Sequence, residues 1–92
     1  MSDTTAIEAR ISGRVQGVSF RAWTEAEARA RGLSGWVRNE ADGTVSAHLA
    51  GPADKVSDMV EALHRGPAAA RVEAVRTSPA KATAKGKFRI IR

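Results

Sequence analysis

The sequence predicts an α+β fold in which an antiparallel sheet carries two helices on one of its faces. Apolar and polar residues alternate from Ile7 to Ser12, which is the pattern of a strand with one buried face. Apolar residues recur at helical spacing between Val56 and Leu63. Two more alternating segments flank an Asp-Gly turn at residues 42–43 and predict a hairpin.

The first half of the chain predicts a strand and a helix joined by a glycine-containing loop. The strand covers residues 7–12 and the loop residues 13–20. The helix ends near Arg31, because Gly32 is a good C-terminal stop. The apolar side of its helical wheel carries Ala22, Trp23, Ala26 and Ala30. The side away from it carries Arg21, Thr24, Glu25 and Arg29.

The second half predicts the hairpin, a second helix and two further strands. Residues 33–38 and 44–49 form the hairpin, and Gly51-Pro52 ends its second strand. The second helix closes at Gly66-Pro67. A fourth strand is indicated by Val72, Ala74 and Val75 and ends near Pro79. A short final strand is indicated by Phe88, Ile90 and Ile91.

This element order, β-α-β-β-α-β, is that of the ferredoxin-like split βαβ sandwich. Short connections and right-handed crossovers place the first strand centrally in the sheet. The loop that follows this strand then lies at the edge of the sheet. Residues 13–20 are therefore well placed to bind a ligand.

Length and composition favour one small domain that spans residues 1–92, since 42% of the residues are hydrophobic. The chain has no cysteine, which excludes disulfides, a thiol nucleophile and a thiolate metal site, and suits the cytoplasm. Its first five residues lack the charged and apolar pattern of a targeting signal. No apolar run approaches the roughly 20 residues that span a bilayer, so we expect no membrane partner.

The net charge of +5 favours an anionic partner, either a small phosphorylated molecule or a nucleic acid. Charge alone does not choose between them. Most basic residues are dispersed, as on an ordinary solvated surface. The exception is a cluster near the C-terminus made of Lys81, Lys85, Lys87, Arg89 and Arg92.

The loop between the first strand and the first helix has the features of an anion cradle. It contains Gly13 and Gly17 and delivers Arg21 at the start of the helix. The first amides of a helix have no intrahelical acceptor and carry about half a positive charge, so a phosphate gains hydrogen bonds there. An arginine adds a permanently charged, fork-shaped donor.

Two common phosphate-binding motifs are excluded for this loop. Its glycines are too closely spaced for a Walker A motif, and no Lys-Ser or Lys-Thr pair follows them. The third, helix-packing glycine of a dinucleotide fingerprint is also missing. A Gly-x-x-x-Gly pattern by itself often does no more than permit a tight turn, so the residues around it decide its interpretation.

Those residues resemble the acylphosphatase family. The first signature segment is Gly13-Arg14-Val15-Gln16-Gly17-Val18-Ser19-Phe20-Arg21, and the second comprises Gly35-Trp36-Val37-Arg38-Asn39 and Asp42-Gly43-Thr44-Val45. The similarity extends over nearly the whole chain, including Gly66-Pro67 and the ending Phe88-Arg89-Ile90. The departures are Ser19, Arg31 and the basic segment from Lys81 to Lys87. The resemblance implies the same sandwich fold.

The resemblance also implies hydrolysis of the mixed anhydride between a carboxylic acid and phosphate. Arg21 would bind the phosphate and Asn39 would position the attacking water, with no metal, cofactor or covalent intermediate. The backbone amides expected to bind the phosphoryl oxygens are those of Val15, Gln16, Gly17, Val18, Ser19 and Phe20. The implied partners are a small-molecule acyl phosphate and inorganic phosphate, which is both product and competing ligand.

An amide is too weak a base to deprotonate water, so we expect the proton to pass to a phosphate oxygen of the substrate. No side-chain acid or base is then essential, a prediction that covers His48, His64, Glu25, Glu27 and Asp42. His48 on the third strand and His64 in the last turn of the second helix are expected at the surface. Trp23 is expected in the core, and Trp36 on the sheet face opposite Val37.

Two other functions compete with this interpretation. RNA-recognition domains share the element order but stack bases on sheet aromatics, whereas aromatics are only 4% here and the strand at residues 44–49 has none. We therefore expect no nucleic-acid partner. A non-catalytic accessory role is a closer rival, because the same domain occurs fused to larger carbamoyl-transferring maturation enzymes. The zinc-finger cysteines of those enzymes are missing, which favours an independent hydrolase. A monomer is the default expectation for a domain this small.

Overall fold

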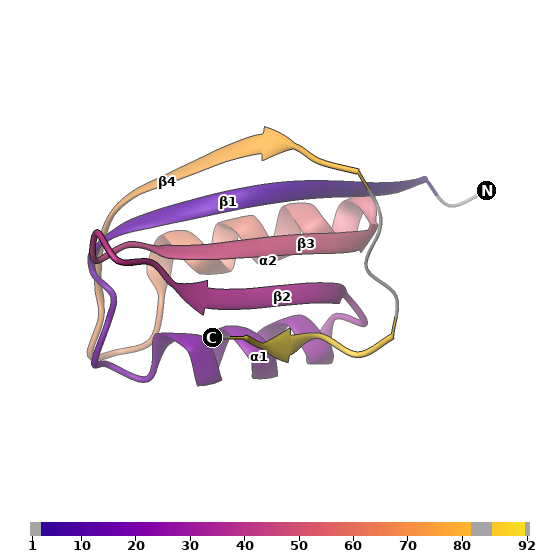
Figure 1. The fold of residues 1–92 in the computed structure, drawn as a ribbon. Coiled ribbons are helices and arrows are strands. Elements are labelled where there is room, and N and C mark those ends of the chain that lie inside the picture. The colour runs from indigo at the N-terminus through magenta and orange to yellow at the C-terminus, as the bar shows by residue number, and fades with distance from the viewer. Residues whose placement is uncertain (1–2, 82–85, 92) are drawn as a thin grey trace.

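Five strands and two helices follow one another in the order β-α-β-β-α-β-β (Figure 1). The computed structural model describes residues 3–81 and 86–91. The elements are β1 (Thr4–Arg14), α1 (Phe20–Ala30), β2 (Ser34–Asn39), β3 (Val45–Pro52), α2 (Ala53–Arg65), β4 (Arg71–Pro79) and β5 (Arg89–Ile90). The predicted elements are all present. Of the predicted basic cluster, Lys85 and Arg92 lie outside the described residues, as do Met1 and Ser2 of the N-terminal segment.

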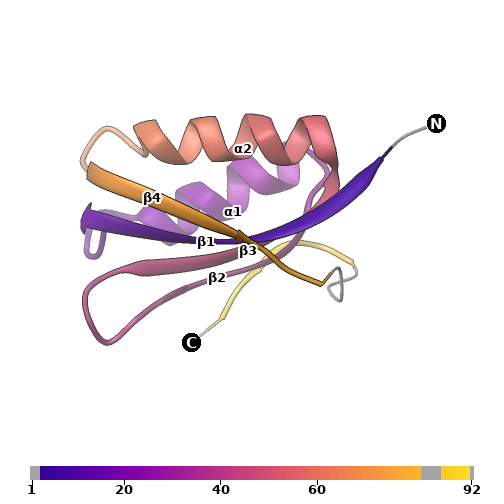
Figure 2. The ribbon, with the colours of Figure 1, turned by 90° about the horizontal axis from the view of Figure 1, so that it is seen from above.

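Both helices cover one face of the sheet, and no helix of the described residues lies on the other face (Figure 2). The strand order is β4-β1-β3-β2-β5, so β1 lies inside the sheet as predicted. The pairs β1–β3, β1–β4 and β2–β3 are antiparallel. None of the helices in the described part of the chain is long and apolar enough to cross a membrane.

The sheet is mixed, which corrects the prediction of a wholly antiparallel one. β5 pairs with β2 in parallel, with Trp36 beside Arg89 and Val37 beside Ile90. Figure 1 shows the reason: β4 points toward the end of the sheet at which β2 begins, so a strand that returns from there beside β2 runs in the same direction. β4 and β5 thus lie at opposite edges of the sheet.

Two strand boundaries differ from the sequence pattern. β3 continues through Gly51 and Pro52 because these residues still pair with the start of β1, opposite Thr5 and Thr4. A proline is tolerated at the end of a ladder, where its missing N–H matters least. Asn39 is the last residue of β2 and pairs with Val45, so it precedes the turn rather than belonging to it.

The buried face of α1 is not the one that the helical wheel predicts. Phe20, Thr24 and Ala28 are buried, whereas the three predicted alanines at positions 22, 26 and 30 are exposed. Alanine side chains carry little apolar area, so their burial orients a helix only weakly. The large ring of Phe20 at the helix start is buried instead, and the residues four and eight positions later lie on the same face and are buried with it. Trp23 is half-buried beside Phe20, with ring centroids 5.4 Å apart.

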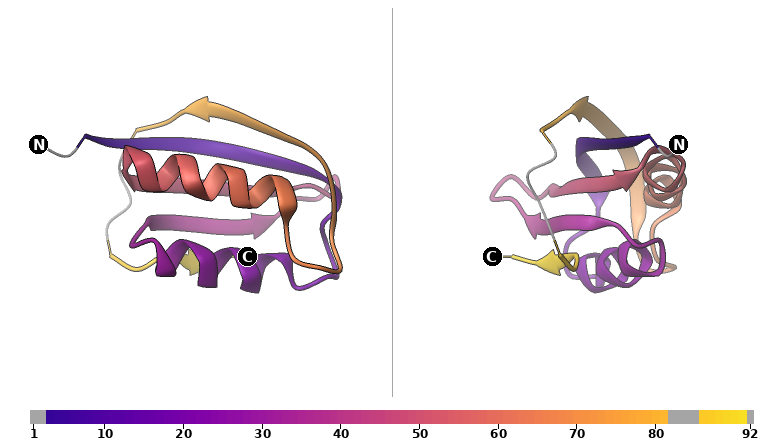
Figure 3. Two further views of the ribbon diagram at one scale, coloured as in Figure 1. Left: turned by 180° about the vertical axis from the view of Figure 1, so that it is seen from behind. Right: turned by 90° about the vertical axis from the view of Figure 1, so that its right-hand side faces the viewer.

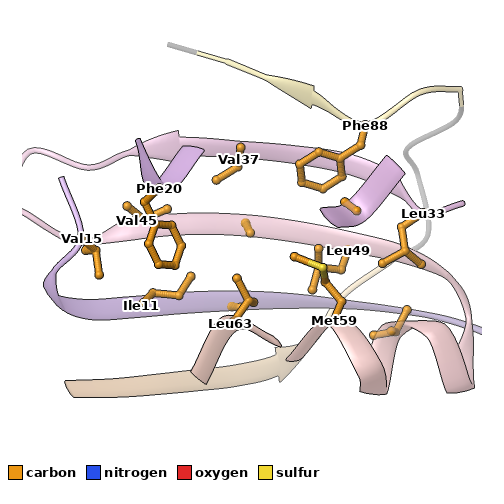
Figure 4. Packing of buried hydrophobic residues seen from close by; sticks show 14 residues of the cluster. Ile11, Val15, Phe20, Leu33, Val37, Val45, Leu49, Met59, Leu63 and Phe88 are labelled. Carbon is orange, nitrogen blue, oxygen red and sulfur yellow. The ribbon is translucent and has the colours of Figure 1, made fainter. Parts of the chain in front are cut away.

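In the view from behind, the two helices lie in front of the sheet (Figure 3). The buried side chains of the core lie between these two layers. Its largest fully buried side chains are Phe20, Phe88, Ile11, Leu49, Met59, Leu63, Val15, Val37 and Val45 (Figure 4). The α2 contribution follows its predicted spacing, since Val56, Met59 and Leu63 are buried. Val15 and Phe20 are each 1% exposed, which anchors both ends of the glycine loop in this core.

His48 is buried, which corrects its predicted place at the surface. It is 4% exposed although it lies on the helix-free face, because the half-buried ring of Trp36 stacks on it with centroids 6.0 Å apart. The Arg38 guanidinium lies 4.7 Å from the centroid of the Trp36 ring. His64 is exposed in the last turn of α2, as predicted.

The close approach of β2 and β3 provides a test of the fold. Gly35 has a φ of +132°, and a Cβ there would lie 1.8 Å from the carbonyl oxygen of His48. Gly43 also has a positive φ, +92°, but no atom lies within 4 Å of its Cβ position. We expect Gly35→Ala to lower the free energy of unfolding by more than about 3 kcal/mol. Gly43→Ala isolates the backbone strain and should cost about 1 kcal/mol.

Denaturant unfolding measures both variants under the same conditions. A similar loss for the two would mean that the contact with the His48 carbonyl carries no cost of its own.

Candidate active site

The loop after β1 and the end of β2 meet at one end of the sheet. Both strands pair antiparallel with β3, which lies between them, so β1 and β2 run in the same direction. Their C-terminal ends therefore reach the same edge, at the left of Figure 1. Residues 15–19 and Asn39, which are far apart in the sequence, are brought together in this way.

A cavity of about 460 Å³ opens at this edge. It is lined by Val15, Gly17, Ser19, Phe20, Arg21, Ala22, Asn39 and Ile90. Six of these eight residues belong to the predicted site. Gln16 and Val18 were predicted with them but do not line the cavity: Val18 packs against the core, and the Gln16 side chain contacts the turn between β2 and β3.

Sequence reasoning missed Ala22 and Ile90. Ala22 was placed on the apolar side of α1, whereas it is exposed and faces the cavity. Ile90 reaches the cavity only because β5 pairs with β2 next to Val37. No local signal marks either residue, since an alanine in a helix and an isoleucine in a strand are ordinary at any position. Together with Val15 and Phe20 they make part of the cavity wall apolar.

The loop presents backbone amides that have no acceptor. Within the described residues, the amides of residues 16–19 donate no backbone hydrogen bond, and the first helical bond runs from the Trp23 amide to the Ser19 carbonyl. Gly17 and Ser19 both have left-handed backbones, with φ of 73° and 62°. Such alternation turns successive N–H groups toward one side and forms an anion-binding concavity.

Ser19 is the only non-glycine residue with positive φ in the described part of the chain. A left-handed conformation costs an L-residue about 1–2 kcal/mol, because its Cβ atom comes too close to the following carbonyl oxygen. Serine has a Cβ atom, unlike glycine, and so carries this cost. The buried side chains of Val15 and Phe20 on either side hold the loop and offset that cost. Strain of this kind is typical of ligand-binding loops.

Arg21 is the second residue of α1, half-buried, and lines the cavity. Four other arginines form ion pairs with carboxylates: Arg10, Arg29, Arg31 and Arg38. Among the described residues Arg21 forms no such pair. No described carboxylate occupies the N–H groups of its guanidinium, so these groups can donate to a ligand. Their charge adds to the positive field of the helix N-terminus, beside the unpaired loop amides.

Asn39 lines the cavity from the end of β2. Its Oδ1 atom is buried and accepts no hydrogen bond within the described residues. An unpaired buried acceptor costs about 1–3 kcal/mol, so the side chain gains free energy when a donor reaches it. The terminal torsion of an asparagine is broad, which lets the amide reorient toward such a donor.

The turn after Asn39 is held by hydrogen bonds of its own. The Glu40 amide donates to the Thr44 carbonyl at 2.8 Å, and the Asp42 carboxylate accepts from the Thr44 amide at 3.0 Å. The Arg38 guanidinium, which donates to Glu40, lowers the pKa of that carboxyl, and hydrogen bonds from Thr44 lower the pKa of Asp42. Both carboxylates are therefore ionised near neutral pH and are unsuited to act as proton donors.

Metal ligands do not gather at this edge. In residues 3–81 and 86–91, no three His, Asp or Glu side chains lie close enough to hold a metal ion together. The site thus consists of backbone amides, one guanidinium, one carboxamide and apolar side chains. Such a set of groups can bind an anion and orient a water molecule.

Known proteins with similar sequences and structures identify the family. The acylphosphatase family model matches residues 7–90. An acylphosphatase of Rhizobium etli is 57% identical over 82 residues, which cover 88% of this chain and 87% of that protein. One from Mesorhizobium japonicum is 53% identical over 87 residues, which cover 94% and 93%. The structure of an acylphosphatase from Coxiella burnetii matches with a TM-score of 0.93 at 32% identity, covering 97% of this chain and 94% of that one. The chain therefore belongs to the acylphosphatase family and is a hydrolase that acts on acyl phosphates.

Proposed function

We propose that the cavity binds the phosphoryl group of an acyl phosphate through the loop amides and Arg21. The observation that carries this proposal is the set of unpaired donors at one helix N-terminus: the amides of residues 16–19 and a guanidinium without an ion-pair partner in the described part of the chain. A phosphoryl group presents several oxygens over which charge spreads in the transition state, and preorganised donors stabilise that charge.

Asn39 positions the attacking water in this proposal. It lines the cavity opposite the loop, and its carboxamide has both an acceptor and donors. The oxygen accepts a hydrogen bond from the water while the nitrogen donates to a substrate oxygen. Its unpaired Oδ1 supports this role, because a donor supplied at that atom relieves the cost of leaving it unsatisfied.

The reaction needs no group from the protein that forms a covalent bond. The water oxygen attacks phosphorus, the bond between phosphorus and the bridging oxygen breaks, and the carboxylate leaves with the bonding pair. The proton of the water passes to a phosphoryl oxygen, so the products are a carboxylate and inorganic phosphate. The carboxylate is a good leaving group, and positioning with electrostatic stabilisation supplies most of the catalysis.

The remaining parts of the proposal concern the whole molecule. We propose that residues 1–92 form one domain that works as a cytoplasmic monomer, without nucleic acid, membrane, metal or cofactor. The lack of cysteine supports a reducing compartment. The low aromatic content supports the exclusion of nucleic acid.

Replacing Arg21 tests the phosphate-binding role. In benzoyl phosphate hydrolysis with a chelator present, Arg21→Ala should lower turnover by about 100-fold or more, because a donor to the transition-state charge is lost. Competition by inorganic phosphate should weaken in the same variant. Arg65→Ala, which removes an exposed arginine at the end of α2, serves as the matched control and should retain both. Turnover and competition that survive in Arg21→Ala would refute the assignment, and an inactive but folded wild type would favour an accessory role.

Replacing Asn39 should separate turnover from binding. Asn39→Ala should lower kcat by about 100-fold, while the inhibition constant for phosphate stays within about threefold of the wild type. Steady-state kinetics with phosphate as inhibitor measure both quantities. An equal loss of the two would mean that Asn39 supports the loop rather than the water.

Substrate-assisted proton transfer predicts that no side-chain acid or base is essential. Single replacements of His48, His64, Glu25, Glu27 and Asp42 by the corresponding amide or by alanine should leave kcat within about threefold, since general acid–base catalysis contributes roughly 100-fold or more where it operates. The same benzoyl phosphate assay measures each variant, with thermal unfolding as a check that the buried His48 position tolerates the change. A collapse of kcat in any folded variant would assign that residue a proton-transfer role.

A further inference from the structure

We propose that Gln16 is a positioning residue that holds Asn39 in register with the phosphate-binding loop, a role that rests on the function proposed above. Gln16 belongs to the loop between β1 and α1 but does not line the cavity. Its side chain reaches the turn between β2 and β3, where it donates to the backbone carbonyls of Glu40 and Thr44. These two residues follow Gln16 in the chain by 24 and 28 positions, respectively. One side chain therefore joins the two halves of the site.

The geometry of this connection matches a primary amide. Gln16 Nε2 lies 2.8 Å from the carbonyl oxygen of Glu40 and 2.9 Å from that of Thr44. The nitrogen has two N–H groups, so each carbonyl receives one of them. Each carbonyl also accepts a bond from within the turn: Glu40 from the Gly43 amide at 3.2 Å, and Thr44 from the Glu40 amide at 2.8 Å. Gln16 thus provides a second donor to each oxygen.

The connection acts on the residue next to the turn. Asn39 is the last residue of β2. The next residue is Glu40, whose carbonyl oxygen accepts the hydrogen bond from Gln16. Because Asn39 Oδ1 has no hydrogen-bond partner of its own in the described structure, the position of this side chain depends on the backbone at residues 39 and 40. A displacement of about 1 Å at a reacting group lowers a rate by up to about 100-fold, so this backbone matters to turnover.

The charges around the turn favour a neutral donor at position 16. Glu40 and Asp42 are negatively charged and form ion pairs with Arg38 and Arg10, respectively. Their pKa values are lowered, so they remain charged near neutral pH. A carboxylate in place of the Gln16 amide would face two carbonyl oxygens with no N–H to donate, and would add a third negative charge to the two that this turn already carries.

Two replacements of Gln16 test the role. Gln16→Leu removes both donors, and Gln16→Glu replaces the nitrogen with oxygen at nearly constant shape. At neutral pH both should lower kcat for benzoyl phosphate by about 10- to 100-fold, with the inhibition constant for inorganic phosphate within about threefold of the wild type. Ser34→Ala is the matched control, because it removes another side-chain-to-backbone bond between distant segments, to the Gly86 carbonyl at 2.7 Å, and should keep kcat.

A pH profile separates this role from a general loss of stability. When protonated, the carboxyl group introduced by Gln16→Glu has one O–H and restores one of the two bonds. The ratio of its kcat to that of the wild type should therefore rise as the pH falls from about 7.5 to about 4.5, the range in which a glutamate near a pKa of about 4.3 or higher gains its proton. The ratio for Gln16→Leu should stay flat.

A double-mutant cycle tests whether Gln16 acts through Asn39. In an Asn39→Ala background, Gln16→Leu should cause no further loss of kcat. A full additional loss would overturn the inference, as would wild-type kcat in Gln16→Leu or an equal fall in kcat and phosphate affinity. Wild-type kcat in Asn39→Ala alone would instead refute the proposed role of Asn39. Loss in Asn39→Ala with none in Gln16→Leu would overturn only the inference about Gln16.

Discussion

The pairing of β1 and β2 with opposite sides of β3 is the constraint on which the site depends. Antiparallel registers on both sides make β1 and β2 run in the same direction, so the loop after one and the last residue of the other reach a common edge. The backbone hydrogen bonds of three strands therefore set the distance between the proposed phosphate-binding loop and Asn39. The close approach at Gly35 belongs to the same constraint, because a Cβ there would push β2 away from β3.

The loop between β1 and α1 is strained locally and held by the core. Val15 and Phe20 are buried at its two ends, and between them Gly17 and Ser19 have left-handed backbones. Burial of a large aromatic side chain contributes roughly 1.5–3 kcal/mol, comparable with the cost of a left-handed serine. Hydrophobic packing thus stabilises a loop whose amides face no protein acceptor among the described residues. In the proposed function these amides act as preorganised donors, which is the condition for electrostatic catalysis.

The distribution of ion pairs is consistent with this arrangement. Arg10 and Arg38 pair with carboxylates around the turn, and Arg29 and Arg31 pair with glutamates one helical turn away. Arg21, the second residue of α1, has Glu25 at i+4, but Glu25 pairs with Arg29 instead. Arg21 therefore lines the cavity without a carboxylate partner among the described residues, whereas the four paired arginines lie around the turn and along α1.

The sequence by itself determined the element order, the approximate strand and helix limits and the core face of α2, because these follow from local periodicity and turn residues. Its signature segments also named Arg21 and Asn39, which the structure brings to one cavity. Only the tertiary structure decided the buried face of α1, the burial of His48 under Trp36, the parallel pairing of β5 and the contact of Gln16 with the turn. The physical reason is that each of these depends on contacts between residues that are distant in the chain or on the competition between large and small side chains for the core. Local patterns carry no information on such contacts.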